Sequence, residues 1–362
     1  MKLTRRAAIA IILVILCVIV HFYSSSSARV EQGYSTHLYQ YIALFLRTCF
    51  GWIPFSFGDI LYGVLFIWLL IKVILFIRNV FRRRTMASFK ERTGRKLLKF
   101  IILLSALYLI FNILWGINYN RKGIASQLGL KMEKYSQEDL KQLNGMLLEK
   151  INLSKEALIR QKRVYPNNDS LISEVKKSYA HLAQQYPYLA YGHVSLKPSI
   201  WGWLGNYAGF SGYYNPFTGE AQLNTTMPRF LLPYTACHEV AHQIGYAKEM
   251  EANFVGYLAA SASKDTLFHY SVYLDLFNYA NRNLYFTDSA AAGVYRKQLS
   301  PAVVADLKEW IAFSRRHRNP VEPIIRWGYG KFLRINQQPQ GILSYDEVTG
   351  FLIAYYKKFG KI

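Results

Sequence analysis

Three long apolar runs occupy the first third of the chain. They cover about residues 7–23, 60–77 and 100–117, and each is long enough to cross the roughly 30 Å hydrocarbon core of a bilayer. We therefore expect three transmembrane helices in a membrane domain of residues 1–117. A second domain of residues 118–362 follows.

An aromatic-rich stretch precedes the second apolar run, from Tyr34 to Phe57. It is compatible with an amphipathic helix that lies on the membrane surface. A loop and helix start packed against the spans would have the same pattern.

Beyond the third run the spacing of apolar residues is mainly helical. Ser136 and Asp139 resemble a capping box that opens a helix running to about Lys150, and Ser154 and residues 169–170 are candidate caps of two further helices. The expected fold class is mainly α (α+β), with three transmembrane helices and a largely helical second domain.

A glycine- and tyrosine-rich segment supplies the small β element. Residues 202–212 are predicted to form a loop, residues 216–219 a turn, and Glu220 to Asn224 a short strand.

The distribution of charge predicts the topology. The chain has 44 Lys and Arg against 22 Asp and Glu, a formal charge of +22, but much of this excess lies in a basic loop of residues 78–99. The positive-inside rule puts this loop and Met1–Arg6 in the cytoplasm, and residues 118–362 on the extracytoplasmic face. We expect a multi-pass protein of the cell membrane, with the lipid bilayer as a partner and no nucleic acid. The cluster Arg315–Arg318 is interpreted as a solvated face, with a contact to lipid or to an anionic envelope polymer as the alternative.

The sequence motif His238-Glu239-x-x-His242 carries the clearest chemistry. On a helix, predicted here to begin near Thr235 and to end at Gly245, the two histidines lie on one face and can bind one Zn²⁺. Glu239 would lie beside the water in the open coordination position. A helix with two core histidines, or zinc binding without catalysis, would have the same spacing.

A third protein ligand is expected close by. Glu249 is the first candidate and Glu251 the alternative. Asn253 lies one helical turn after Glu249, where its amide could orient a ligand histidine.

These residues resemble the gluzincin metallopeptidases, in which a glutamate on the next helix is the third ligand. The pattern Glu249-x-x-Ala-Asn253 is similar to that of the membrane-bound CAAX-protease and heat-shock peptidase group, and of the phage-repressor-cleaving peptidases. Together with the three spans and Gly212-Tyr-Tyr-Asn-Pro216, it looks like an uncharacterised bacterial membrane protein family, known only as a domain of unknown function. The resemblance implies a zincin-like domain. It also implies that the strand from Glu220 is an edge strand that binds substrate, with Tyr213, Tyr214 and Asn224 lining the cleft.

The sequence thus predicts a membrane-anchored zinc metallopeptidase that hydrolyses peptide bonds of envelope proteins or peptides. Glu239 would act as general base for the zinc-bound water and return the proton to the leaving amine. Alternatives are an amidase acting on cell-wall peptide, and a non-catalytic, zinc-stabilised receptor or scaffold.

Overall fold

The protein is mainly helical with a small sheet, as the sequence predicts. The computed structural model describes the backbone of residues 4–82 and 89–362, and the side chains of residues 4–78 and 96–362. In addition to three long helices, the helical elements are α2 (Ser27–Arg29), the π-helix η1 (Val30–Leu38), α3 (Tyr39–Phe50), η2 (Gly116–Asn120), α6 (Gly123–Gln127), α7 (Gln137–Arg160), α8 (Asn168–Gln185), η3 (Pro187–Leu189), α9 (Gly202–Ala208), η4 (Arg229–Leu231), α10 (Leu232–Gln243), α11 (Glu249–Ser261), α12 (Thr266–Thr287), α13 (Ser289–Lys297), α14 (Pro301–Arg316), α15 (Glu322–Ile335), η5 (Gly341–Tyr345) and α16 (Val348–Phe359).

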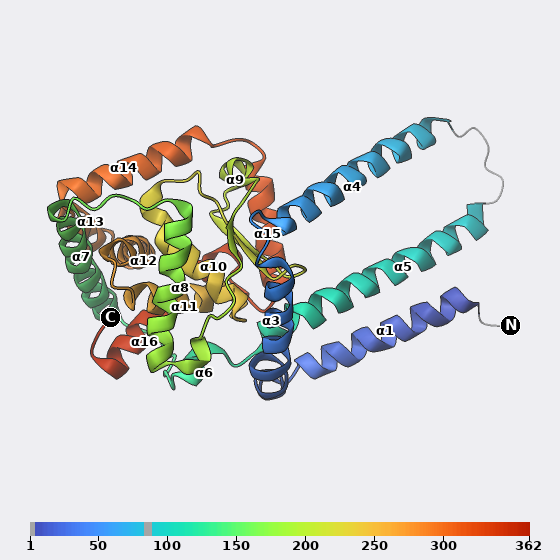
Figure 1. Cartoon of the computed structure of the whole chain (residues 1–362), viewed down its shortest axis with the longest axis horizontal. Coiled ribbons are helices and arrows are strands. Elements are labelled where there is room, and N and C mark those ends of the chain that lie inside the picture. The colour runs from blue at the N-terminus through green and yellow to red at the C-terminus, as the bar shows by residue number, and fades with distance from the viewer. Residues whose placement is uncertain (1–3, 83–88) are drawn as a thin grey trace.

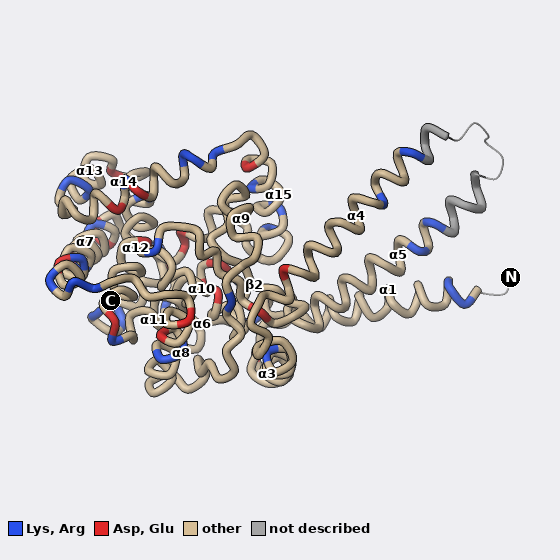
Figure 2. Tube along the Cα trace, turned by 45° about the horizontal axis from the view of Figure 1, so that its top comes forward, with Lys and Arg blue, Asp and Glu red and all other residues tan. Residues whose placement is uncertain are grey.

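The three long helices extend from one side of a helical body (Figure 1). They are α1 (Arg5–Ser24), α4 (Phe57–Arg82) and α5 (Phe89–Leu114), and within the described residues they are the helices long and apolar enough to cross a membrane. In Figure 2, Lys and Arg are concentrated toward the ends of these helices that lie away from the body.

The third predicted span extends too far at its C-terminal end. The helix stops at Leu114 because the backbone turns at Trp115 (φ −162°) and continues as the 3-10 helix η2. The predicted loop 78–99 is shorter than expected, since α4 continues to Arg82 and α5 already begins at Phe89. Its middle, residues 83–88, lies outside the described part of the chain.

Helix caps in the body agree with the predictions only in part. The capping box of Ser136 and Asp139 is present at the start of α7. The helix does not stop near Lys150, however, and Ser154 is no cap, because its hydroxyl donates to the Lys150 carbonyl (2.6 Å) inside the same helix. The cap of α8 is Asn167 rather than residues 169–170.

The sheet has three strands in the described residues, in the order β1-β3-β2. β3 (Glu220–Leu223) pairs in parallel with β1 (Leu196–Pro198) and antiparallel with β2 (Gly212–Asn215). The predicted strand from Glu220 is therefore real, but it is central, so its predicted role as an edge strand is wrong. The sequence did not predict β1, whose three residues are too short to have a recognisable pattern. Residues 202–212 are not all loop either, since they contain α9.

Two of the long helices begin or end in contact with the body. At the start of α4, the buried Glu220 carboxylate accepts hydrogen bonds from the backbone N–H groups of Phe57 (3.1 Å) and Gly58 (2.5 Å). Glu220 also pairs with the buried Lys197 ammonium at 2.7 Å. A strand thus satisfies the free N–H groups at the N-terminus of an apolar helix.

The stretch Tyr34–Phe57 contains α3, which lies on the side of the body from which the long helices emerge (Figure 1). Tyr39 is buried against the body, and its hydroxyl donates to the Gln243 carbonyl at 2.8 Å. Tyr41, Phe45 and Trp52 are exposed. The helix therefore has an apolar face on each side, one of which packs against the body.

Candidate metal centre

The helix that carries His238-Glu239-x-x-His242 is α10, which runs through the centre of the body. All of its residues are buried. It begins at Leu232, not near Thr235, because Pro233 occupies the first turn and the Thr235 hydroxyl donates back to the Leu231 carbonyl (3.0 Å). Its predicted end is confirmed, since Gly245 turns the chain with a φ of +97°.

After this turn the chain returns as α11, which packs closely on α10. Gly256 makes the approach possible: a Cβ atom there would lie 3.0 Å from the backbone nitrogen of His238. The close packing brings the first residue of α11, Glu249, next to both histidines.

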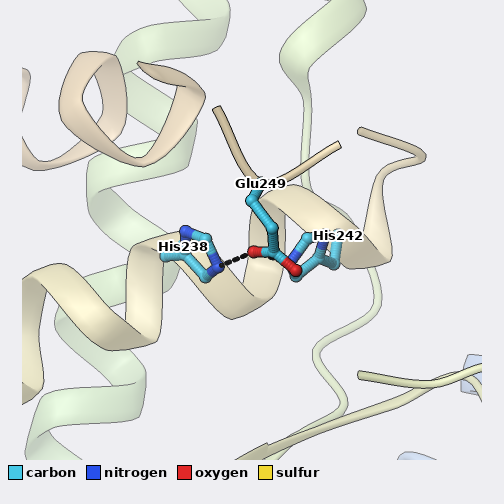
Figure 3. A group of neighbouring side chains, drawn as sticks. All are labelled: His238, His242 and Glu249. Atoms are coloured by element: carbon cyan, nitrogen blue, oxygen red, sulfur yellow. Dashed lines mark ion pairs between the residues drawn. The ribbon is translucent and has the colours of Figure 1, made fainter. Parts of the chain in front are cut away.

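His238, His242 and Glu249 form a compact group, in which one potential ligand atom from each residue lies within 4.8 Å of the others. Glu249 Oε2 is 3.3 Å from His238 Nε2 and 3.4 Å from His242 Nε2. Figure 3 shows the carboxylate directed toward both imidazoles. No further His, Cys, Asp or Glu joins this group in the described part of the chain, which leaves an open side.

Hydrogen bonds around the group orient two of its members. His242 Nδ1 lies 2.8 Å from the Tyr246 carbonyl, so Nδ1 carries a proton and Nε2 faces Glu249. Burial lowers the pKa of His242, but the Glu249 carboxylate outweighs it and raises that pKa to about 9, and a metal ion at Nε2 would displace the second proton. The Tyr329 hydroxyl donates to Glu249 Oε1 (2.6 Å), while Glu249 Oε2 has no hydrogen-bond partner in the described residues. Oε2 thus faces only the two imidazole nitrogens, and a carboxylate oxygen with two imidazole nitrogens is a donor set that fits a divalent cation.

The third long helix also contributes to the support of this group. Trp115, which directly follows α5, donates from its indole nitrogen to the His242 carbonyl at 3.2 Å. Its ring lies edge to face with the His242 imidazole, with centroids 6.1 Å apart.

The pKa values of the group follow from burial and from mutual charge. Burial alone would raise the pKa of Glu249, but the two imidazoles hold that pKa well below its usual range. Burial lowers the pKa of His238, which favours the neutral imidazole that a metal needs.

Glu239 lies beside the group and is almost fully buried. Burial, aided by the negative charge of Glu249, raises its pKa to about 8. Its Oε2 atom has no hydrogen-bond partner in the part of the chain that the structure describes. Glu239 faces a cavity of about 210 Å³, whose lining also includes His238, Phe210, Gly212 and Tyr345.

Gly212 begins the edge strand β2 at this cavity. A Cβ atom at this position would lie 2.6 Å from Glu239 Oε1, so only glycine leaves room for the carboxylate. β2, rather than the predicted β3, is thus the edge strand beside Glu239.

The two candidates for the third ligand point to different places. Glu251 lies on α11 too, but its carboxylate packs against Gly123, where a Cβ atom would lie 1.9 Å from Oε1. Glu251 is outside the histidine group, and Glu249 is inside it.

Asn253 lies in the same cavity lining as His238. Its amide nitrogen donates to the Tyr345 carbonyl (3.2 Å), and His238 Nδ1 has no hydrogen-bond partner among the described residues. The suggested orienting contact from Asn253 to a histidine therefore stays a prediction.

The three residues predicted to line the cleft lie outside this cavity lining. The Tyr213 hydroxyl donates to Asp59 of α4, and Tyr214 is buried between Trp115 and Tyr39. The Asn224 amide nitrogen donates to Asn206 Oδ1 (2.6 Å) and to the Phe210 carbonyl, so it braces a loop.

Sequence reasoning missed Trp115, Tyr246, Tyr329 and Tyr345. Tyr345 stacks near the His238 ring, with centroids 6.2 Å apart, and lines the cavity. Trp115 and the two C-terminal tyrosines are far from the motif in the sequence. No local signal distinguishes Tyr329 and Tyr345 from the other tyrosines of the chain, 28 in all.

Comparison with known proteins gives one match. A family model described as "Protein of unknown function (DUF3810)" matches residues 34–353, a range that includes the whole metal centre. No curated protein and no solved structure matches the chain.

Proposed function

The chain belongs to the DUF3810 family, and from the geometry of its buried centre we propose that it is a membrane-anchored, zinc-dependent metallopeptidase. Its substrates are envelope proteins or peptides. The observation that carries the proposal is the buried group of His238, His242 and Glu249, of which His238 lines a cavity together with Glu239.

The number and type of ligands support catalysis over a structural role. A structural zinc site usually has four protein ligands, whereas catalytic sites have three and one open position. In the described residues the group has three ligands, and a second carboxylate, Glu239, shares the cavity with His238. A non-catalytic receptor or scaffold has no need of such a base.

The chemistry divides between the ion and the side chains. A zinc ion held by His238, His242 and Glu249 supplies a Lewis acid, which lowers the pKa of water to about 7 and polarises a carbonyl. The positive charge of a bound cation would lower the raised pKa of Glu239 and so leave its carboxylate ionised. Glu239 then takes up the proton of the attacking water and gives it to the nitrogen of the leaving amine. Tyr345, in the same cavity lining, can donate a hydrogen bond to the oxyanion that develops.

The body lies on the extracytoplasmic face, against the membrane surface. The positive-inside rule supports this orientation, since the basic residues of the long helices lie toward the ends remote from the body (Figure 2). Tryptophan is typical of the membrane–water interface. Trp52, Trp201 and Trp327 are exposed. The Trp201 indole donates to the Asp59 carbonyl of α4 (3.0 Å). Trp327 belongs to α15, whose Phe332 lies against Phe111 of α5.

Glu239→Gln tests the proposed role of the base. The amide keeps the size of the side chain but cannot accept a proton, so we expect retained zinc and a loss of turnover of at least about 100-fold. Zinc content is measured by elemental analysis of the full-length protein in detergent, and turnover by mass spectrometry of a proteome-derived peptide mixture.

His238→Ala is the matched control, since it removes a ligand and should abolish both zinc binding and turnover. Peptide hydrolysis at the wild-type rate in Glu239→Gln would refute the assigned role. Zinc in the wild type without any hydrolysis would favour the receptor or scaffold.

A further inference from the structure

The cavity that Glu239 lines is continuous with a larger groove. Phe210, Asp275 and Tyr345 belong to the lining of both the small cavity and a neighbouring cavity of about 770 Å³. The larger cavity lies between α9, α12, α14 and α15, so a chain bound at Glu239 can extend into it.

The basic residues that line this groove are all arginines. Arg282, Arg315, Arg318 and Arg326 line the larger cavity, and Arg334 joins them in the depression that follows along α15. Arginine presents a planar fork of N–H donors that matches the two oxygens of a carboxylate or phosphate, which lysine does not.

Two of these arginines already have acidic partners. Arg282 pairs with Asp346, and Arg326 lies 3.5 Å from Glu322. Arg315 and Arg318 form no ion pair with any residue that the structure describes. Both are free to bind an anion.

The acidic residue at the floor of the groove does little to neutralise them. Burial raises the pKa of Asp275 to about 7, so near neutral pH it is only partly charged. The groove therefore keeps an excess of positive charge next to the metal centre.

A simpler explanation of the arginines accounts for only part of the pattern. Arg315 lies in the last turn of α14, where a cation is favoured by the helix dipole. Arg334 likewise lies in the last turn of α15, but Arg318 lies beyond the end of α14 and Arg326 lies in the first half of α15. Residues from separate elements thus converge on one groove.

On the basis of the proposed peptidase function, we propose that the groove selects acidic peptides, with Arg315 and Arg318 holding the carboxylate of an acidic side chain. The scissile bond then lies at Glu239 and the carboxylate lies in the groove. A peptide fits the position better than a lipid headgroup, because the groove leads directly into the cavity of the base.

The test measures binding without turnover, so that it remains informative if hydrolysis is not found. Full-length Glu239→Gln protein is immobilised in phosphatidylcholine nanodiscs and incubated with a synthetic pool of amidated octapeptides. Each position of the pool holds glutamate, glutamine or alanine in equal amounts. Mass spectrometry of the retained peptides gives the enrichment of glutamate over glutamine at each position.

We expect glutamate to be enriched at least about fivefold at one or two positions. Arg315→Gln with Arg318→Gln should abolish this enrichment. The control is Arg296→Gln with Arg316→Gln, which removes the same charge from two exposed arginines outside the groove lining and should leave the enrichment intact.

Equal retention of glutamate and glutamine peptides by the parent protein would overturn the proposal. So would an enrichment that both double variants reduce alike, since this would reflect only the net charge of the protein. The same variants are also tested for binding to phosphatidylglycerol vesicles. A loss confined to the vesicles would assign the arginines to lipid phosphate instead.

Discussion

Two buried acidic clusters lie on either side of the sheet region, and they differ in how their oxygens are satisfied. At the start of α4, both oxygens of Glu220 accept hydrogen bonds, from Phe57, Gly58, Lys197 and Thr218. At the candidate metal centre, Glu239 Oε2 has no partner in the described residues, and Glu249 Oε2 has only the two imidazole nitrogens, at 3.3 and 3.4 Å.

This difference separates a structural cluster from a functional one. A fully satisfied buried network fixes one geometry, and here it attaches an apolar helix to the sheet. A buried oxygen without a partner destabilises the fold unless a ligand binds it. Glu251 Oε2 also has no partner in the described residues, so it is the two histidines beside Glu249 that distinguish the candidate metal centre.

The largest expected difference is that between Glu220→Gln and Glu249→Gln in their effect on the free energy of unfolding. Glu220→Gln leaves the buried Lys197 ammonium without its counter-charge, and we expect a loss of about 3–5 kcal/mol in the free energy of unfolding. Glu249→Gln should abolish zinc binding, yet in the presence of chelator it should unfold close to the wild type. Thermal unfolding of the full-length proteins in detergent, with and without chelator, measures both effects.

Wild-type stability of Glu220→Gln would contradict the structural role of its cluster. Collapse of Glu249→Gln in chelator would show that the metal centre, too, is needed for the fold itself.

The sequence predicted the functional cluster better than the structural one. His238 and His242 are one helical turn apart, so periodicity placed them on one face. Spacing left Glu249 and Glu251 as alternatives for the third residue, and the packing of α11 on α10 brings Glu249 into the group. Glu220 and Lys197 come from two short strands, and their partners Phe57 and Gly58 lie far earlier in the chain. No local pattern encodes such long-range hydrogen bonds.

The same reason explains why the predicted cleft residues lie outside the cavity lining. Tyr213 and Tyr214 are consecutive in β2, so their side chains point to opposite faces of the sheet. Without knowledge of β1, the sequence did not show which of the two faces each side chain takes. Tyr213 reaches Asp59 of α4, which a prediction that treated the spans as a separate domain could not anticipate.

Tyr329→Phe tests the contact that orients the third ligand. Tyr329 donates the hydrogen bond that holds Glu249 Oε1, while Oε2 faces the histidines. Loss of such a supporting hydrogen bond typically weakens metal affinity about 10–100-fold, which corresponds to about 1.4–2.7 kcal/mol. Competition with a fluorescent zinc chelator measures the affinity.

The control for this substitution is Tyr207→Phe, a half-exposed tyrosine on α9 whose hydroxyl lies outside the centre. An unchanged affinity in Tyr329→Phe would mean that packing alone holds the Glu249 carboxylate in place.

The smallest expected effect concerns the end of the third long helix. Trp115→Phe removes the indole donor to the His242 carbonyl, but this carbonyl also accepts from the Gly245 N–H at 3.0 Å and so keeps one partner. We therefore expect a loss of only about 0.5–1.5 kcal/mol in stability, equal with and without zinc. Trp310→Phe, on α14, makes the same chemical change away from the centre. A fall in zinc affinity of more than about tenfold in Trp115→Phe would mean instead that the end of α5 positions the His242 imidazole. The apolar helix would then belong to the metal centre as well as to the membrane anchor.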